Sequence, residues 1–254
     1  MSQSENNKRI AKNTLMLYFR MLLMMAVNLY TSRVILQVLG VEDYGIYSVV
    51  GGVVSLFSII SSSLSAATQR FITFGLGKND RDHLSRVFST SIYIHIAMCV
   101  LIVVLAETIG LWFLNNEMQI PTDRANSAMW VYQCAVISSV IMIMSVPYNA
   151  TIIAHEKMGT FAVISLLEVF LKLGIVYLLL LFSVDKLVLY AVLLVITQMF
   201  VRCCYTIYCK RHFEETNIKK VKDVTEEIKI ESTQISLKEI DDKLSDVDSI
   251  INNL

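Results

Sequence analysis

The sequence predicts an all-α membrane protein, a bundle of helices that cross a lipid bilayer. Of the 254 residues, 55% are hydrophobic and 17% are charged, and the mean hydropathy is +0.57. A soluble domain is about 45–50% apolar and about 25% charged, so this chain carries more apolar surface than its own interior can bury. The apolar residues form long runs without two-residue alternation, which favours membrane helices over a β-barrel.

The apolar runs divide residues 1–212 into six predicted spans. Crossing about 30 Å of hydrocarbon takes roughly 20 residues at a rise of about 1.5 Å per residue. Six segments reach this length, and they predict a six-transmembrane helix bundle. The segments are 15–39, 44–74, 87–114, 128–154, 161–184 and 187–208.

The first span carries polar side chains on one face. At about 100° per residue, Asn13, Arg20, Asn28 and Thr31 fall within about 80°, so this face is expected to look into the protein. The Arg20 guanidinium suits a phosphate-bearing group, which it binds through paired hydrogen bonds. The sequence leaves open a second interpretation, in which Arg20 extends to the membrane interface.

The second and fourth spans contain residues that shape helix packing. Small or polar residues recur every three or four positions along the second span, at Gly51, Ser55, Ser58, Ser62, Ser65 and Gln69. Such a stripe favours close helix contact over cavity lining. Pro147 is predicted to bend the fourth span, because its ring removes a backbone hydrogen bond.

The fifth span places Ser165, Glu168 and Lys172 on one stripe. Glu168 precedes Lys172 by four residues, which is the favourable helical order for an ion pair. In one interpretation the two charges only neutralise each other so that the helix can insert. In the other, which we favour, they line a polar cavity and bind substrate or couple to protons.

Basic residues predict the orientation of the chain, because cytoplasmic loops collect lysine and arginine. Alternate connections are basic, with Lys8, Arg9, Lys12, Lys78, Arg81, Arg86, Lys157, Lys210 and Arg211 on one side. The opposite connections hold Arg124 and Lys186 among several acids. The sequence therefore predicts a multi-pass plasma (inner) membrane protein with both termini cytoplasmic. The first span is too long for a signal peptide and is expected to remain as an anchor.

No motif of a catalytic or metal site is complete. Residues 72–79 end in Gly-Lys, but Ile72 and Asn79 replace the glycine and hydroxyl residue that a phosphate-binding loop requires. The four histidines lack zinc-protease spacing, and the five cysteines lack C-x-x-C spacing and are expected to be small buried hydrophobes. Asp80 and Asp82 match a loose D-x-D pattern that arises easily by chance. We predict no enzymatic activity, no cofactor and no bound nucleic acid.

Several short runs carry a resemblance to a known family. They are Arg33-Val34-Ile35-Leu36, Leu39-Gly40, Asp43-Tyr44-Gly45-Ile46-Tyr47, Ala66-Ala67-Thr68-Gln69-Arg70-Phe71, Pro147-Tyr148-Asn149-Ala150 and Ala154-His155-Glu156-Lys157-Met158. In this order they resemble bacterial polysaccharide biosynthesis proteins, the O-antigen-type flippases of the multidrug/oligosaccharidyl-lipid/polysaccharide exporter superfamily. The resemblance covers residues 8–212.

The resemblance implies a transporter that moves undecaprenyl-pyrophosphate-linked oligosaccharide repeat units across the membrane for cell-surface polysaccharide such as lipopolysaccharide. Such flippases have two lobes around a central, often cationic cavity. It implies that Arg20, Lys172 and Arg70 are the lining cations, on the polar faces that also hold Asn28 and Glu168. Six spans correspond to one lobe, the N-terminal half, so a parallel homodimer or a separate chain is expected to supply the second lobe.

Two alternatives stay open from the sequence. One is an ion-coupled exporter of small amphipathic compounds, which would need acids in its cavity, and Glu168 and Glu107 are the deep acids of the spans. The other is a truncated lobe that serves as a non-transporting membrane scaffold.

Residues 213–254 are predicted to form an acidic cytosolic helical tail. They hold 11 acids and 6 bases, whereas the preceding 212 residues have a net charge of +5. Apolar residues follow a heptad pattern at Leu237, Ile240, Leu244, Val247, Ile251 and Leu254. This pattern predicts a coiled coil that pairs two copies, or equally an amphipathic helix that lies on the bundle. Its acidity argues against binding to an anionic membrane surface.

Overall fold

The computed structural model describes residues 3–55, 57–78, 81–118, 120–182 and 185–216, and all regular structure in these ranges is helical. The first half contains α1 (Gln3–Ser55), α2 (Phe57–Lys78), α3 (Arg81–Leu105), the π-helical turn η1 (Ala106–Gly110) and α4 (Leu111–Asn116). The second half contains α5 (Ala125–Ala154), α6 (Met158–Leu178), α7 (Lys186–His212) and the 3-10 turn η2 (Glu214–Thr216). The predicted heptads of the tail lie outside the described residues.

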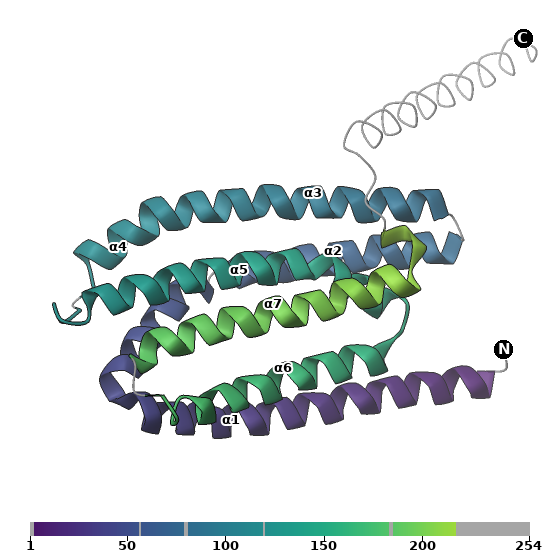
Figure 1. Cartoon of the computed structure of the whole chain (residues 1–254). Coiled ribbons are helices and arrows are strands. Elements are labelled where there is room, and N and C mark those ends of the chain that lie inside the picture. Colours follow the sequence, from purple (N-terminus) through teal and green to yellow (C-terminus); the bar gives the residue numbers. More distant parts are fainter. Residues whose placement is uncertain (1–2, 56, 79–80, 119, 183–184, 217–254) are drawn as a thin grey trace, which may run out of the picture.

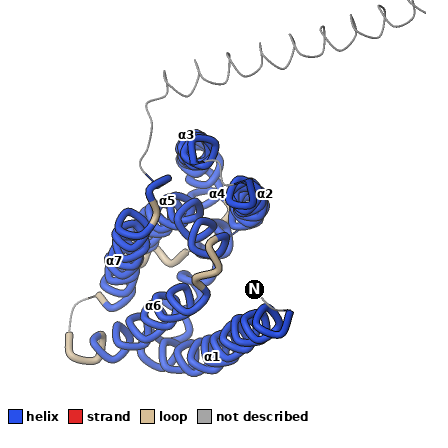
Figure 2. Tube along the Cα trace, turned by 90° about the vertical axis from the view of Figure 1, so that its right-hand side faces the viewer, coloured by secondary structure: helices blue, strands red, loops and turns tan. Residues whose placement is uncertain are grey.

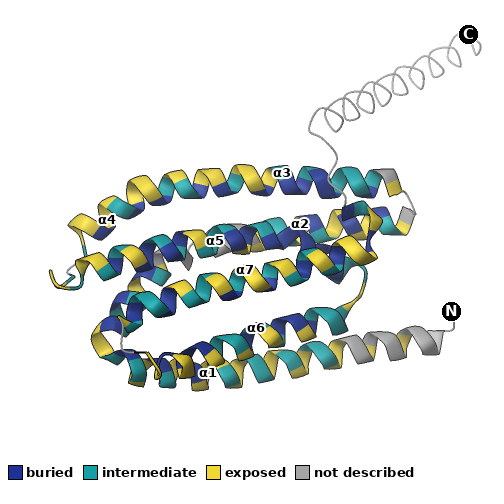
Figure 3. Ribbon diagram, viewed as in Figure 1, coloured by how far each residue is buried: buried dark blue, intermediate teal, exposed yellow. Residues whose placement is uncertain are grey.

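The long helices run side by side in one bundle (Figure 1). Helix α5 is central, since it packs against α7, α2, α3 and α1. Helix α1 pairs with α6 at the opposite side of the bundle from α3, as the end-on view in Figure 2 shows. In Figure 3, residues along the outer faces of α1 and α3 have the colour of exposed residues, and many exposed residues of these helices are large and apolar. This distribution suits helices that face lipid.

The predicted boundary between the first two spans is found inside α1. Gly40 has φ 83 and ψ 170, a conformation that interrupts the helix and that favours glycine because it has no Cβ. The predicted second span, 44–74, falls on the end of α1 and on α2, and residue 56 between them lies outside the described residues.

Five described helical segments are long and apolar enough to cross a membrane. They are Thr14–Gly52, His83–Asn116, Ala125–Ala154, Met158–Leu178 and Lys186–His212. Helix α2 has the length of a span but is not among these five, and it carries several serines with Gln69 and Arg70. The all-helical membrane fold is therefore confirmed, whereas the count of six spans stays a prediction.

The segment His83–Asn116 contains the π-helical turn η1, and this turn packs closely against α5. The Tyr132 hydroxyl of α5 donates a hydrogen bond of 2.8 Å to the carbonyl oxygen of Ala106. A Cβ on Gly110 would lie 1.9 Å from that hydroxyl, so only glycine fits there without a shift. Helix α5 itself continues through Pro147, whose carbonyl accepts a hydrogen bond of 2.8 Å from the Thr151 hydroxyl.

The helix ends gather at two ends of the bundle. The start of α1, the junction of α5 and α6, and the C-terminal end of α7 lie at one end in Figure 1. The bend at Gly40 and the start of α5 lie at the other end. The connections that the sequence groups as basic therefore share one end of the bundle, and the cytoplasmic location of this end stays a prediction.

Candidate functional site

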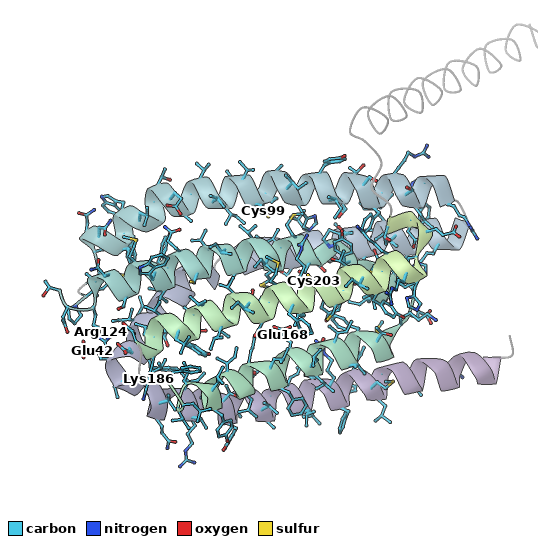
Figure 4. All side chains as sticks on the ribbon, in the orientation of Figure 1. Glu42, Cys99, Arg124, Glu168, Lys186 and Cys203 are labelled. Atoms are coloured by element: carbon cyan, nitrogen blue, oxygen red, sulfur yellow. The ribbon has the colours of Figure 1, made fainter. Side chains whose placement is uncertain are left out.

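Polar side chains of three helices meet in the half of the bundle formed by α1, α6 and α7. We call this group the polar seam. Its members are Arg20, Asn28 and Thr31 of α1, Ser165, Glu168 and Lys172 of α6, and Gln198 and Tyr205 of α7. The α1–α6 and α6–α7 contacts bring the three polar faces together, and Figure 4 shows Glu168 in this region.

Glu168 and Lys172 form an ion pair within the seam. The Lys172 Nζ donates to the Glu168 Oε1 at 2.6 Å, as the four-residue spacing predicts. Their side chains are 30% and 28% exposed, so both charges are partly shielded. One turn earlier, the Ser165 hydroxyl lies 3.3 Å from that of Tyr205, which ties α6 to α7. The pair is therefore held in a polar, semi-enclosed setting.

Arg20 turns toward α6. Its guanidinium carbon lies 4.3 Å from the centre of the Phe161 ring, a cation–π contact. Its buried Nε has no hydrogen-bond partner among the described residues. Arg20 and Glu168 both lie close enough to Tyr205 to act electrostatically on its hydroxyl. The structure thus places Arg20 against the seam instead of extended along α1.

A cavity of about 230 Å³ lies within the seam, between Asn28, Thr31, Lys172, Tyr190 and Gln198. The Thr31 Oγ1 and the Gln198 Oε1 are buried without a partner among the described residues. Buried polar atoms are normally hydrogen-bonded, so these two atoms fit a site that water or a polar ligand fills.

A longer hollow of about 580 Å³ follows α1 past Arg20 and Asn28. Asn28 and Ser32 line both this hollow and the smaller cavity. The longer hollow is lined by α1 alone, mostly by leucines and methionines, and it meets the smaller cavity at Asn28 and Ser32.

The remaining predicted site residue, Arg70, is not brought to the seam. It lies on the exposed side of α2, a helix that packs on α3 and α5. The structure therefore unites Arg20, Asn28, Glu168 and Lys172 and leaves Arg70 apart from them.

Sequence reasoning missed three polar residues of α7. Gln198, Arg202 and Tyr205 are spaced by four and three positions, the same signal of one helix face that identified the stripes of α1 and α6. The Arg202 Nη1 donates to the Ile141 carbonyl oxygen at 3.5 Å, and its guanidinium carbon lies 5.9 Å from the Tyr148 ring centre. A charge inside the sixth predicted span was therefore visible in the sequence.

At the end of the bundle that holds the start of α5, four side chains form a clasp. Arg124 donates to Asp43 Oδ2 at 3.1 Å and to Asp185 Oδ2 at 3.3 Å, and the Ser127 hydroxyl donates to the same Asp185 oxygen at 2.6 Å. Partial burial alone would raise the pKa of Asp185. The hydrogen bonds from Ser127 and from the first backbone amides of α7, with the charge of Arg124, hold it below its ordinary value. The clasp joins α1, α5 and α7, and it gives Asp43 a structural role.

The first residues after α7 dock at the opposite end. Phe213 is buried and stacks on His155, with ring centres 4.0 Å apart. His155 also forms a short ion pair with Glu215. Burial would raise the pKa of Glu215, but its hydrogen bonds and the nearby charges of His155 and Arg81 hold it below its ordinary value. The beginning of the predicted tail is thus attached to the bundle.

The described part of the chain contains no group of three histidine, cysteine, aspartate or glutamate side chains that could hold a metal ion. All five cysteines are free thiols, and Cys99, Cys134 and Cys209 are buried. The site therefore consists of charged and hydrogen-bonding side chains along helices.

Comparison with known proteins identifies one family. The MatE family model matches residues 17–178, which include the α1 and α6 parts of the polar seam. Comparisons with curated proteins and with solved structures give no significant match. Because the family match covers more than half of the chain, the chain belongs to the MatE family, a family of multi-pass membrane transporters within the multidrug/oligosaccharidyl-lipid/polysaccharide exporter superfamily.

Proposed function

We propose that this transporter moves a lipid-linked oligosaccharide, of the undecaprenyl-pyrophosphate type, from the inner to the outer leaflet for cell-surface polysaccharide biosynthesis. The supporting observation is that Arg20 and Lys172 border two spaces that meet at Asn28 and Ser32 on α1. Two cations at different depths suit an anionic group that passes from one cation to the other as the substrate moves along the helix axes.

Each cation contributes in its own way. The Phe161 ring holds the Arg20 guanidinium at the seam, and paired donors bind phosphate oxygens strongly. Lys172 is paired with Glu168 at rest, so a diphosphate competes with this carboxylate for the ammonium group. In the empty protein, Glu168 neutralises the charge of Lys172. When substrate arrives, the diphosphate replaces Glu168 as the partner of Lys172. Binding to one of two alternating conformations then moves the substrate without covalent chemistry.

A translocation assay tests this proposal. Proteoliposomes with the full chain and fluorescent lipid-linked saccharide report the rate at which the saccharide changes leaflets. Arg20→Gln is expected to slow this rate by about tenfold or more, because a charged hydrogen bond contributes about 1.5–3 kcal/mol. Arg33→Gln is the matched control, since Arg33 lies on the same helix but is exposed. Equal rates for both variants would contradict the proposal.

One observation favours a second candidate, an ion-coupled exporter of small amphipathic compounds. Glu168 is an acid within the seam, where it could exchange protons with the transported ion or substrate. Under this alternative, the unchanged protein gives resistance to small toxic amphiphiles but does not translocate the saccharide, and Glu168→Gln abolishes the resistance. Under the flippase proposal the saccharide rate falls.

We further propose that this bundle pairs in the membrane with a parallel second copy or with a bundle of another chain, with the termini on the cytoplasmic side. Cross-linking of the full chain in native membranes tests this arrangement. A dimer supports the first form and a heterologous partner the second, whereas recovery of monomer alone contradicts both.

A further inference from the structure

A second polar site lies in the other half of the bundle, at His95 in the middle of α3. His95 is completely buried. Its Nδ1 lies 2.7 Å from the carbonyl oxygen of Ser91, and the Ser91 hydroxyl lies 3.0 Å from that of Thr68 on α2. A carbonyl oxygen only accepts hydrogen bonds, so Nδ1 carries the proton. In the neutral ring, Nε2 is therefore an acceptor, and it has no partner among the described residues.

His95 lines a groove between α2 and α3 with a volume of about 330 Å³. We call this space the α2–α3 groove. Its walls are mostly apolar and include Leu64, Ala67, Phe71 and Ile94. This volume lies at the lower end of the range for sites that bind small organic molecules, about 300–1,000 Å³. The groove can therefore hold one slender apolar ligand.

The groove has an arginine and a histidine near one end and a hydrogen-bond acceptor at depth. His83 and Arg86 line it near the start of α3. Arg86 precedes His95 by nine residues, a distance of about 14 Å along the helix. Along α3, the groove is thus lined first by His83 and Arg86, then by apolar side chains, and finally by the buried imidazole of His95.

We propose that the α2–α3 groove binds a single-chain anionic amphiphile whose chain carries a hydroxyl group. The anionic head lies near Arg86 and His83, the chain lies along Leu64, Phe71 and Ile94, and the hydroxyl donates to Nε2 of His95. An unsubstituted chain leaves that nitrogen without a partner, and this difference gives the site its selectivity. The site is separate from the polar seam, which lies between α1, α6 and α7.

Binding of two matched probes to the purified full chain in nonionic detergent tests the proposal. Native mass spectrometry gives apparent Kd values for ω-hydroxydodecanoate and dodecanoate, which differ only in the hydroxyl group. We expect the hydroxylated probe to bind about twofold to tenfold more tightly, the range of one net hydrogen bond. Dodecyltrimethylammonium, which has a cationic head, should bind more weakly than dodecanoate. Equal binding of the three probes would overturn the proposal and indicate non-specific lipid contact.

Variants locate the probe at the groove. His95→Phe keeps a ring but removes the acceptor, so it should abolish the preference for the hydroxylated probe, while His95→Gln should retain part of it. Ala67→Phe should block the groove and weaken the binding of both carboxylate probes, ω-hydroxydodecanoate and dodecanoate. Ala97→Phe is its control, because Ala97 is exposed on α3 and does not line the groove. A hydroxyl preference that survives His95→Phe, or equal effects of the two alanine replacements, would place the binding elsewhere and refute the proposal.

Discussion

Replacing Glu168 and Lys172, singly and together, separates the two interpretations of this ion pair. The single change Lys172→Met leaves the Glu168 carboxylate without its partner at 2.6 Å. An exposed pair contributes about 0–1 kcal/mol, whereas removing one partner of a fully buried pair costs about 3–5 kcal/mol. With side chains 30% and 28% exposed, this pair lies between the two limits. We therefore expect the single variant to lose about 1–3 kcal/mol of unfolding free energy.

The double variant Glu168→Met, Lys172→Met removes both charges and leaves neither unpaired. It is expected to recover most of the lost stability, since apolar replacements of an ion pair are often neutral or stabilising. It should still lack saccharide translocation, because the ammonium group that binds phosphate is gone. Reversible unfolding in mixed micelles measures the stability, and proteoliposomes measure transport.

The combination of the two measurements decides the role of the pair. A stable double variant that transports at the normal rate would show that the pair only allows the helix to insert. That result would refute the reasoning that Lys172 engages substrate.

Three further predictions concern the structure around the site. Arg124→Gln should cost about 2–4 kcal/mol of unfolding free energy, because it leaves the buried Asp43 unpaired; a loss below about 0.5 kcal/mol, typical of a surface change, would contradict the clasp. The contribution of Glu215 to stability should be complete above its ordinary pKa of 4.5 and should disappear as the pH falls through its lower folded-state pKa. Melting curves at decreasing pH check this, and the acid-dependent loss should be smaller in Glu215→Gln. Gly110→Ala should lose about 1–3 kcal/mol by overpacking, and Tyr132→Phe in the same chain should restore part of it; no rescue in melting curves would contradict the contact at 1.9 Å.

Local sequence patterns were sufficient to predict the features of the structure that depend on a single helix. The ion pair of Glu168 and Lys172 follows from a four-residue spacing, and the break near residue 40 follows from a glycine between two apolar runs. The grouping of basic connections at one end of the bundle follows from counting spans, because each apolar run that is long enough reverses the direction of the chain.

Features that depend on neighbouring helices were not predictable in this way. Arg20 and Phe161 are 141 positions apart, so no spacing rule relates them, and their contact depends on α1 packing against α6. The clasp likewise joins Asp43 inside α1 to Arg124 and Asp185, which precede α5 and α7.

The central claim is that the seam of α1, α6 and α7 is a wet route for a phosphate-bearing substrate, and labelling at Asn28 tests it most directly. Asn28→Cys, in a chain whose five native cysteines are replaced, is treated with a charged, water-soluble maleimide in proteoliposomes. The control is Phe170→Cys, which lies on the outer, exposed side of α6. We predict that position 28 reacts, that position 170 does not, and that lipid-linked saccharide slows the reaction at position 28. Failure of position 28 to react, or reaction at an unchanged rate with the saccharide present, would contradict the account.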